Sequence, residues 1–206
     1  MSFVGGVGYS NIDLIYSGLD RLPDKGEEIF ARGFSMQFGG GIPATMINLS
    51  RLGVESRIIT FAGHDLFSEF VKKTLNSYPV KTVNLYKGNK MPVVLSSTLL
   101  YCGDRSFISY TDGMDLNDAV MDEVYENLKG AYVVDMHVGF LDVYKRLKKD
   151  GCIQIFDTGW EDDLTLEKYK DYLEIADYYI PNQKEAMKIT GTVSYTHLRA
   201  HETAAN

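Results

Sequence analysis

The fold of this chain is decided by residues 28–61, which read EIFARGFSMQFGGGIPATMINLSRLGVESRIITF. Alternating apolar and polar residues ahead of the glycines predict a half-buried strand over residues 28–38. A helix should follow the glycines, because Pro43 is tolerated in a first helical turn and apolar residues recur at helical spacing up to Gly53. A second apolar strand is expected over residues 56–61. The order strand, glycine loop, helix and strand is typical of an α/β fold.

The same alternation of strand and helix patterns extends through the rest of the chain. We expect strands at residues 3–8, 12–16, 93–101, 106–110, 131–136, 152–156 and 178–180, and helices at 66–75, 117–128, 141–148 and 166–176. Two excursions, near residues 14–36 and 91–111, have strand patterns without crossover helices and cannot belong to a parallel sheet. The sequence therefore predicts a doubly wound, mostly parallel α/β sheet, with a small antiparallel β lid over a ligand at the strand carboxyl ends.

Composition and charge narrow the function classes. The 206 residues are 45% hydrophobic and carry a formal net charge of −7, which disfavours a nucleic-acid partner. No run approaches the ~18 apolar residues of a membrane span, and no basic leader precedes an apolar run, so we expect a cytoplasmic protein without membrane contact. Cys102 and Cys152 lack the spacing of a zinc site or a disulfide framework.

Four motifs occur in order along residues 1–191. They are GYSNID at residues 8–13, FGG at 38–40 ahead of a helix ending in RLG, GDRSF at 103–107 in a predicted hairpin, and ADYYIPNQKEA at 176–186. Their order resembles that in the PfkB (ribokinase-like) carbohydrate kinase family over all of residues 1–191. The resemblance implies an enzyme that uses ATP and Mg²⁺ to phosphorylate a hydroxyl of a small sugar substrate.

The first two motifs imply a sugar site. By the resemblance, Asp13 accepts hydrogen bonds from sugar hydroxyls with help from Asn11, which suits the capacity of a carboxylate to accept from two vicinal hydroxyls. Gly39 and Gly40 would let the backbone approach the ligand at a helix N-terminus. The sequence departs from the family pattern at Ala44, where relatives usually carry an Asn that contacts the sugar.

Three further residues are candidates for ligand binding. Arg105, in the lid motif, could hold a phosphate or carboxylate of the substrate, or equally be a solvated residue of a hairpin turn. His137 and Asp157 each follow a predicted core strand, at the edge where α/β folds bind ligands. We assign His137 to the substrate and Asp157 to the nucleotide.

The fourth motif implies the cofactor site. By the resemblance, Asn182 and Glu185 organise Mg²⁺ and the phosphates of ATP, with Glu185 acting on the metal indirectly through water. This role suits magnesium, which prefers oxygen ligands and keeps several waters. The spacing alone is equally well explained by an N-cap Asn and a capping-box Glu.

The end of the sequence departs from the pattern of the rest. Residues 193–203 break the apolar periodicity and match the translation of a transposase-based sequencing adapter, so we interpret residues 192–206 as a non-native tail and residues 1–191 as a truncated kinase domain. Family kinases use a later G-A-G-D segment whose Asp is the catalytic base, and residues 1–191 contain no such segment. No catalytic residue is therefore assigned, and we expect this chain to have little or no kinase activity.

Two other function classes stay open. An NAD-dependent oxidoreductase would use the GxG at Gly6 and Gly8, but a predicted strand rather than a helix follows, and the third glycine of the motif is missing. A noncatalytic sugar-binding module would use Asp13 and the glycine loop without chemistry. The sequence also leaves open the kind of sugar or nucleoside substrate and a homodimer formed through the lid.

Overall fold

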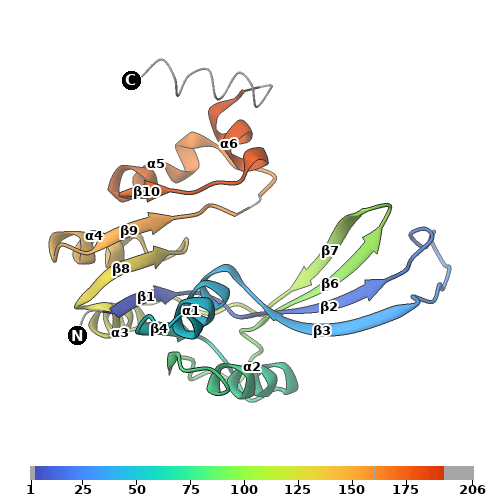
Figure 1. The fold of residues 1–206 in the computed structure, drawn as a ribbon, viewed down its shortest axis with the longest axis horizontal. Helices are drawn as coiled ribbons and strands as arrows, with labels where there is room; N and C mark the ends of the chain where they lie inside the picture. The colour runs from blue at the N-terminus through green and yellow to red at the C-terminus, as the bar shows by residue number, and fades with distance from the viewer. Residues whose placement is uncertain (1–2, 160, 193–206) are drawn as a thin grey trace.

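The structure, a computed structural model, describes residues 3–159 and 161–192; the predicted non-native tail lies outside the described residues except for Thr192. Its core is a six-stranded sheet in the order β10-β9-β8-β1-β4-β5, in which every pairing is parallel (Figure 1). The strands are β1 (Phe3–Val7), β4 (Ser56–Thr60), β5 (Lys81–Asn84), β8 (Ala131–Met136), β9 (Ile153–Phe156) and β10 (Tyr178–Tyr179). This arrangement confirms the predicted mostly parallel α/β core.

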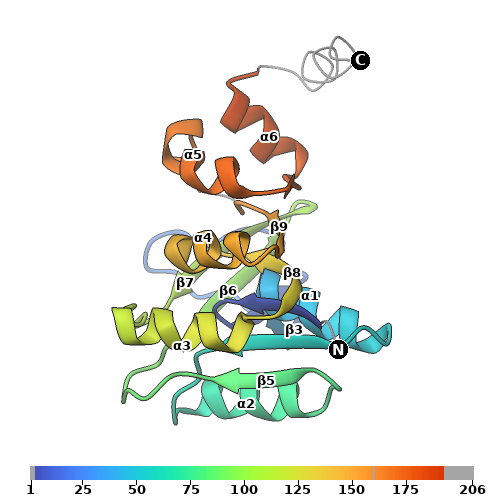
Figure 2. The same cartoon turned by 90° about the vertical axis from the view of Figure 1, so that its left-hand side faces the viewer.

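Helices cover both faces of the core sheet, as a doubly wound fold requires. They are α1 (Gly41–Arg51), α2 (Leu66–Asn76), α3 (Asp118–Leu128), α4 (Leu141–Lys149), α5 (Leu166–Ile175) and α6 (Gln183–Thr190). The apolar faces of α1 and α2 lie in one buried cluster, and those of α3, α4 and α5 lie in a second. Figure 2 shows α3 and α4 side by side over the sheet. None of the helices in the described residues is long and apolar enough to cross a bilayer.

The central strand β1 is approached closely from both faces. A Cβ on Gly5 would lie 2.7 Å from Leu128 of α3, and a Cβ on Gly6 would lie 2.6 Å from Ile42 of α1. Both contacts are shorter than side chains tolerate, so glycine lets the two helices pack directly on the strand. Because Ile42 belongs to the first turn of α1, this packing fixes the start of α1 beside the carboxyl end of β1.

The lid is a separate four-stranded sheet in the order β3-β2-β6-β7. Its strands are β2 (Asn11–Ser17), β3 (Gly33–Gly39), β6 (Val94–Tyr101) and β7 (Asp104–Tyr110). The β2–β3 and β6–β7 pairs are antiparallel as predicted, but the central pair β2–β6 is parallel, so the expectation of a wholly antiparallel lid is corrected. The reason is that β2 and β6 both run outward from the core and each returns through the next strand, so the two outgoing strands meet in the middle (Figure 1).

A strand begins and ends where it has a neighbouring strand to pair with, and its residue composition alone does not fix these limits. β3 begins at Gly33, not at residue 28, because its partner β2 ends at Ser17, which pairs with Gly33. The last bond of this pairing is from the N–H of Arg32 to the carbonyl of Ser17, at 3.0 Å, so residues 28–31 are not in a strand although their side chains alternate. The edge strand β5 was not predicted, because its four residues, KTVN, are too few and too polar to give a strand pattern.

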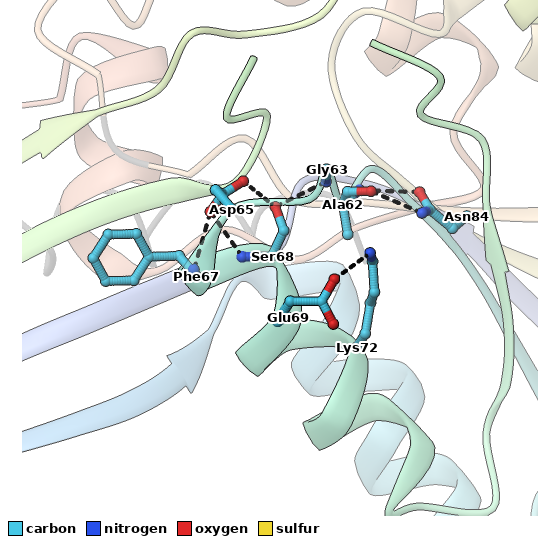
Figure 3. Close-up of polar contacts among 8 residues, drawn as sticks. All are labelled: Ala62, Gly63, Asp65, Phe67, Ser68, Glu69, Lys72 and Asn84. Carbon is cyan, nitrogen blue, oxygen red and sulfur yellow. Dashed lines mark hydrogen bonds and ion pairs between the residues drawn. The ribbon is translucent and has the colours of Figure 1, made fainter. Parts of the chain in front are cut away.

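Side-chain hydrogen bonds hold the loop between β4 and α2 (Figure 3). Oδ1 of Asp65 caps α2 by accepting from two N–H groups of the first turn, at 2.9 and 3.0 Å. Oγ of Ser68 donates to Oδ2 of Asp65 at 2.6 Å and accepts from the N–H of Gly63 at 2.8 Å. Asn84 bonds both the N–H and the carbonyl of Ala62, at 3.0 and 2.8 Å. The loop is thus anchored at the carboxyl edge of the core sheet.

Candidate functional site

Asp13 lies on β2 in the lid rather than at the end of a core strand. Its Oδ1 accepts a hydrogen bond from Nδ2 of Asn11 at 2.7 Å. The neighbouring strand places Gly39 opposite Asn11, and a Cβ on Gly39 would lie 2.7 Å from Oδ2 of Asp13. Glycine therefore keeps space around Oδ2, which has no hydrogen-bond partner among the described residues. The protein holds one carboxylate oxygen and leaves the other open to a ligand hydroxyl.

Gly40 makes the turn from β3 into α1. Its φ of 101° lies in the left-handed region that favours glycine, and a Cβ there would lie 2.9 Å from the carbonyl oxygen of Tyr9. Gly40 is the N-cap of α1, and no side chain caps the helix at this position. The first N–H groups of α1 are therefore available to an oxygen of a ligand or of water. The structure thus brings Asn11, Asp13, Gly39 and Gly40 together.

A cavity of about 230 Å³ lies where the start of α1 meets the carboxyl ends of β8 and β9. It is lined by Gly41, Ile42, Thr45, Asp135, Met136, His137, Asp157, Thr158, Gly159 and Ile180. Two predicted site residues, His137 and Asp157, belong to its wall. Gly41, one of the lining residues, directly follows Gly39 and Gly40. The residues around Asp13 and the cavity therefore both adjoin the start of α1.

Asp135 is a residue of this wall that the sequence did not predict. Burial raises the pKa of Asp135 to about 6; the Thr45 hydroxyl lowers it, and the charge of Asp157 raises it. The available signal was a single acidic residue within the otherwise apolar strand pattern AYVVDM. Part of the raised pKa of Asp135 comes from Asp157, which follows β9 and lies close to Asp135 only in the folded sheet. The cavity therefore contains a carboxyl group whose pKa, about 6, is raised well above the ordinary value for an aspartate.

One ring nitrogen of His137, Nε2, has no hydrogen-bond partner within residues 3–159 and 161–192. Its backbone N–H donates to Oη of the buried Tyr144 at 2.8 Å, and its Nδ1 lies 2.8 Å from the carbonyl oxygen of Val138. Because a carbonyl can only accept, Nδ1 carries the proton and Nε2 is left as an acceptor. Burial lowers the pKa of His137, which favours this neutral form. His137 can therefore accept a hydrogen bond from a ligand hydroxyl.

Asn182 and Glu185 form a capping box at the start of α6. Oδ1 of Asn182 accepts from the N–H of Glu185 at 3.1 Å, and Oε2 of Glu185 accepts from the N–H of Asn182 at 2.9 Å. Nδ2 of Asn182 also donates to Oε1 of Glu185. Both oxygens of the buried Glu185 are thus engaged within the cap, and neither residue lines the cavity.

Arg105 lies far along the lid, at the start of β7, next to the turn that joins β6 to β7. It is exposed, and its guanidinium lies over the ring of Phe107 at 5.5 Å from the centroid. It pairs across the sheet with Leu100, near the outer end of β6, whereas Asp13 pairs near the inner end, with Ser96. The structure therefore does not bring Arg105 to Asp13 or to the cavity.

Comparison with known proteins identifies the family of the chain. The model of the pfkB family of carbohydrate kinases matches residues 1–205. A deoxyribokinase from Salmonella typhi is 24% identical over 211 residues, which cover 94% of this chain and 65% of that protein. The chain spans less than two-thirds of the length of the curated relatives it matches.

Two solved structures share the fold. Ribokinase from Arabidopsis thaliana, complexed with ribose and ATP, matches with a TM-score of 0.74 and 22% identity, covering 99% of this chain and 68% of that one. Ribokinase from Giardia lamblia matches with a TM-score of 0.79 and 19% identity, covering 97% of this chain and 63% of that one. Because the family match extends over residues 1–205, the chain belongs to the pfkB family of carbohydrate kinases.

Proposed function

We propose that the whole protein transfers the terminal phosphoryl group of ATP to a hydroxyl of a neutral sugar. The observation that carries the proposal is the Asp13 carboxylate, whose Oδ2 is open beside Gly39 at the start of α1. A carboxylate held in this way accepts hydrogen bonds from sugar hydroxyls and fixes which hydroxyl points toward the core. Ribose and ATP in the Arabidopsis ribokinase support the same pair of ligand classes for this protein.

The charge of the site favours a neutral sugar over a sugar acid or a phosphosugar. The cavity wall contains the carboxyl groups of Asp135 and Asp157, and none of the described residues that line it is Lys or Arg. An anionic substrate would meet like charge there, because its repulsion from carboxylates is strengthened where water is partly excluded. Neutral hydroxyls can instead donate to these oxygens.

The carboxylates of the chain fit a metal held through water better than one held directly. Within residues 3–159 and 161–192, no three His, Cys, Asp or Glu side chains are grouped to hold a metal ion. Both oxygens of Glu185 already accept hydrogen bonds within the α6 cap, so Mg²⁺ would reach Glu185 only through a water bonded to one of these oxygens, with Asp157 near the nucleotide phosphates. Magnesium keeps several waters in proteins, which suits such an indirect site. Bound Mg²⁺ would supply charge neutralisation on the phosphates.

A noncatalytic sugar-binding protein is the second candidate. The 206 residues contain no G-A-G-D segment, and so lack the family's catalytic base. Binding at Asp13 needs no such base. This alternative differs from the kinase in having affinity for a sugar without ADP release.

The first test is to sequence the source DNA beyond codon 191 and to assay the complete protein. ADP release from ATP and Mg²⁺ is measured with D-ribose, 2-deoxy-D-ribose, D-glucose, D-fructose, gluconate and ribose 5-phosphate. We expect turnover of one or more neutral sugars and none with the last two. Sugar binding with no ADP release from any of them would favour the noncatalytic alternative.

A variant pair tests the role of Asp13. Asp13→Asn should weaken sugar binding roughly tenfold or more, since it removes the charge that accepts the hydroxyls. Asp115→Asn makes the same change at an exposed position and should leave binding unchanged. Equal affinity of Asp13→Asn and the unchanged chain would contradict the proposed sugar site.

A second copy of the chain is the protein partner that we propose for the lid. Phe34, Met36 and Ile108 are 61%, 41% and 70% exposed. The strand register places them on one face of the lid. Light scattering after gel filtration would show a dimer, and Ile108→Glu should shift it to monomer.

A further inference from the structure

One face of the lid carries a row of polar side chains that starts at Asp13. The strand register places Asp13 opposite Ser96 of β6, and Ser96 opposite Ser109 of β7. Partners in register lie on the same face of a sheet, so these three side chains cross the lid from β2 to β7. Figure 1 shows β6 lying between the other two strands.

Hydrogen bonds connect this row to the Asp13 carboxylate through Asn11. Oγ of Ser96 donates to Oδ1 of Asn11 at 3.2 Å, and Nδ2 of Asn11 donates to Oδ1 of Asp13 at 2.7 Å. Oγ of Ser109 lies 2.8 Å from Oγ of Ser96. Because the single hydroxyl proton of Ser96 goes to Asn11, Ser109 is the donor in that pair. In this series of hydrogen bonds, each donor therefore points toward Asp13.

The direction in which these hydrogen bonds are donated fixes the orientation of the Asn11 side-chain amide. In the reverse orientation the amide oxygen of Asn11 would face a carboxylate oxygen of Asp13, and its NH₂ would face Ser96. Only the observed orientation lets Asn11 donate to Asp13 while it accepts from Ser96. Ser96 is only 5% exposed, so it acts on the amide rather than on a ligand directly.

We propose that Ser96 is a positioning residue for Asp13: through Asn11 it holds Oδ1 of the carboxylate and leaves Oδ2 free for a substrate hydroxyl. The identity of the ligand rests on the proposed function, whereas the hydrogen-bond chain does not. Ser109 supports Ser96 from the outer strand and should contribute less, because it lies one hydrogen bond further from Asn11.

Thr98 offers a matched control on the same strand. It lies two residues beyond Ser96, on the same face, and is 4% exposed. Its Oγ1 has no hydrogen-bond partner among the described residues, so it has no link to Asn11. Thr98→Val and Ser96→Ala therefore each remove one buried hydroxyl from β6. Only Ser96→Ala interrupts the series of hydrogen bonds that leads to Asp13.

The test observes the Asn11 amide directly, by ¹⁵N–¹H NMR of the 206-residue chain without ligand. Its side-chain NH₂ pair is identified as the signal that disappears in Asn11→Ala. We expect Ser96→Ala to shift this pair and to speed its exchange with water, Ser109→Ala to do so less, and Thr98→Val to leave it unchanged. Ser96→Thr keeps the hydroxyl and should restore the signal toward that of the unchanged chain.

Binding of D-ribose, measured by calorimetry, gives the second readout. Ser96→Ala should weaken binding roughly tenfold, and the double variant with Asn11→Ala should lose little more than Asn11→Ala alone, because both act through one carboxylate. Additive losses, or an Asn11 signal equally shifted in Thr98→Val, would overturn the proposal. If Ser96→Ala does not fold, Ser109→Ala and Ser96→Thr decide by the NMR signal. If the unchanged chain binds no ribose, only the ligand assignment is affected, and the NMR result still decides the role of Ser96.

Discussion

Replacing Asp135 by Asn should stabilise the protein above neutral pH and have little effect in acid. Burial is the main reason that the pKa of Asp135 rises from 3.8 to about 6. The folded state therefore disfavours the charged form of Asp135, which lowers the free energy of unfolding. This loss is absent below pH 3.8, the pKa in the unfolded chain, grows between pH 3.8 and about pH 6, and is complete above that. At 1.36 kcal/mol per pKa unit the rise corresponds to about 3 kcal/mol, of which we expect about 2 kcal/mol to be recovered, because the cavity admits some water.

Urea denaturation from about pH 4 to pH 8 measures this difference. The free energies of unfolding of Asp135→Asn and the unchanged chain should differ by less than about 0.7 kcal/mol near pH 4 and diverge toward about 2 kcal/mol at pH 7. Asp115→Asn, the same change at an exposed site, controls for net charge. A difference independent of pH, or one that grows toward acid, would refute the reasoning. Weaker sugar binding by the stabilised variant would show that the carboxylate is kept for function.

Three further changes have defined outcomes. Gly39→Ala should weaken binding of the sugar identified in the panel by roughly tenfold, because the added Cβ would lie 2.7 Å from Oδ2 of Asp13; unchanged affinity in calorimetry would contradict this. Tyr144→Phe should lower the free energy of unfolding by about 1–3 kcal/mol in urea, because the N–H of His137 loses its acceptor; a loss below about 0.5 kcal/mol would argue against it. Asp65→Ala should destabilise the chain by about 1 kcal/mol in thermal unfolding, through loss of the α2 cap, and Asp65→Asn should recover most of that loss.

The elements that local patterns specify were predictable, and those that depend on distant partners were not. The glycine loop before α1 and the order of the core strands and helices, apart from the short polar edge strand β5, follow from periodicity and turn chemistry. The start of β3 required knowledge of where β2 ends, and the parallel contact of β2 with β6 required the direction of both strands.

The candidate site divides in the same way. Asn11, Asp13 and the two glycines were predictable because they are close together in short motifs. Asp135 was missed because its environment is made by Thr45 and Asp157, which are distant in sequence and meet only in the folded cavity. The spacing of Asn182 and Glu185 predicted a capping box, which the structure contains, but it does not by itself indicate a metal.

The position of Asp13 is set by the core even though the residue belongs to the lid. Oγ of Ser10 and Oγ1 of Thr60 are buried and lie 2.8 Å apart, which ties the start of β2 to the end of β4. The carbonyl of Ser10 also accepts from the N–H of Val94, so the two chain segments that enter the lid are bonded to each other at its base. These bonds fasten the base of the lid to the core three residues before Asp13. If Asp13 binds a sugar hydroxyl as proposed, the binding carboxylate lies close to this fastened base, and closing of the outer strands would follow binding rather than create the site.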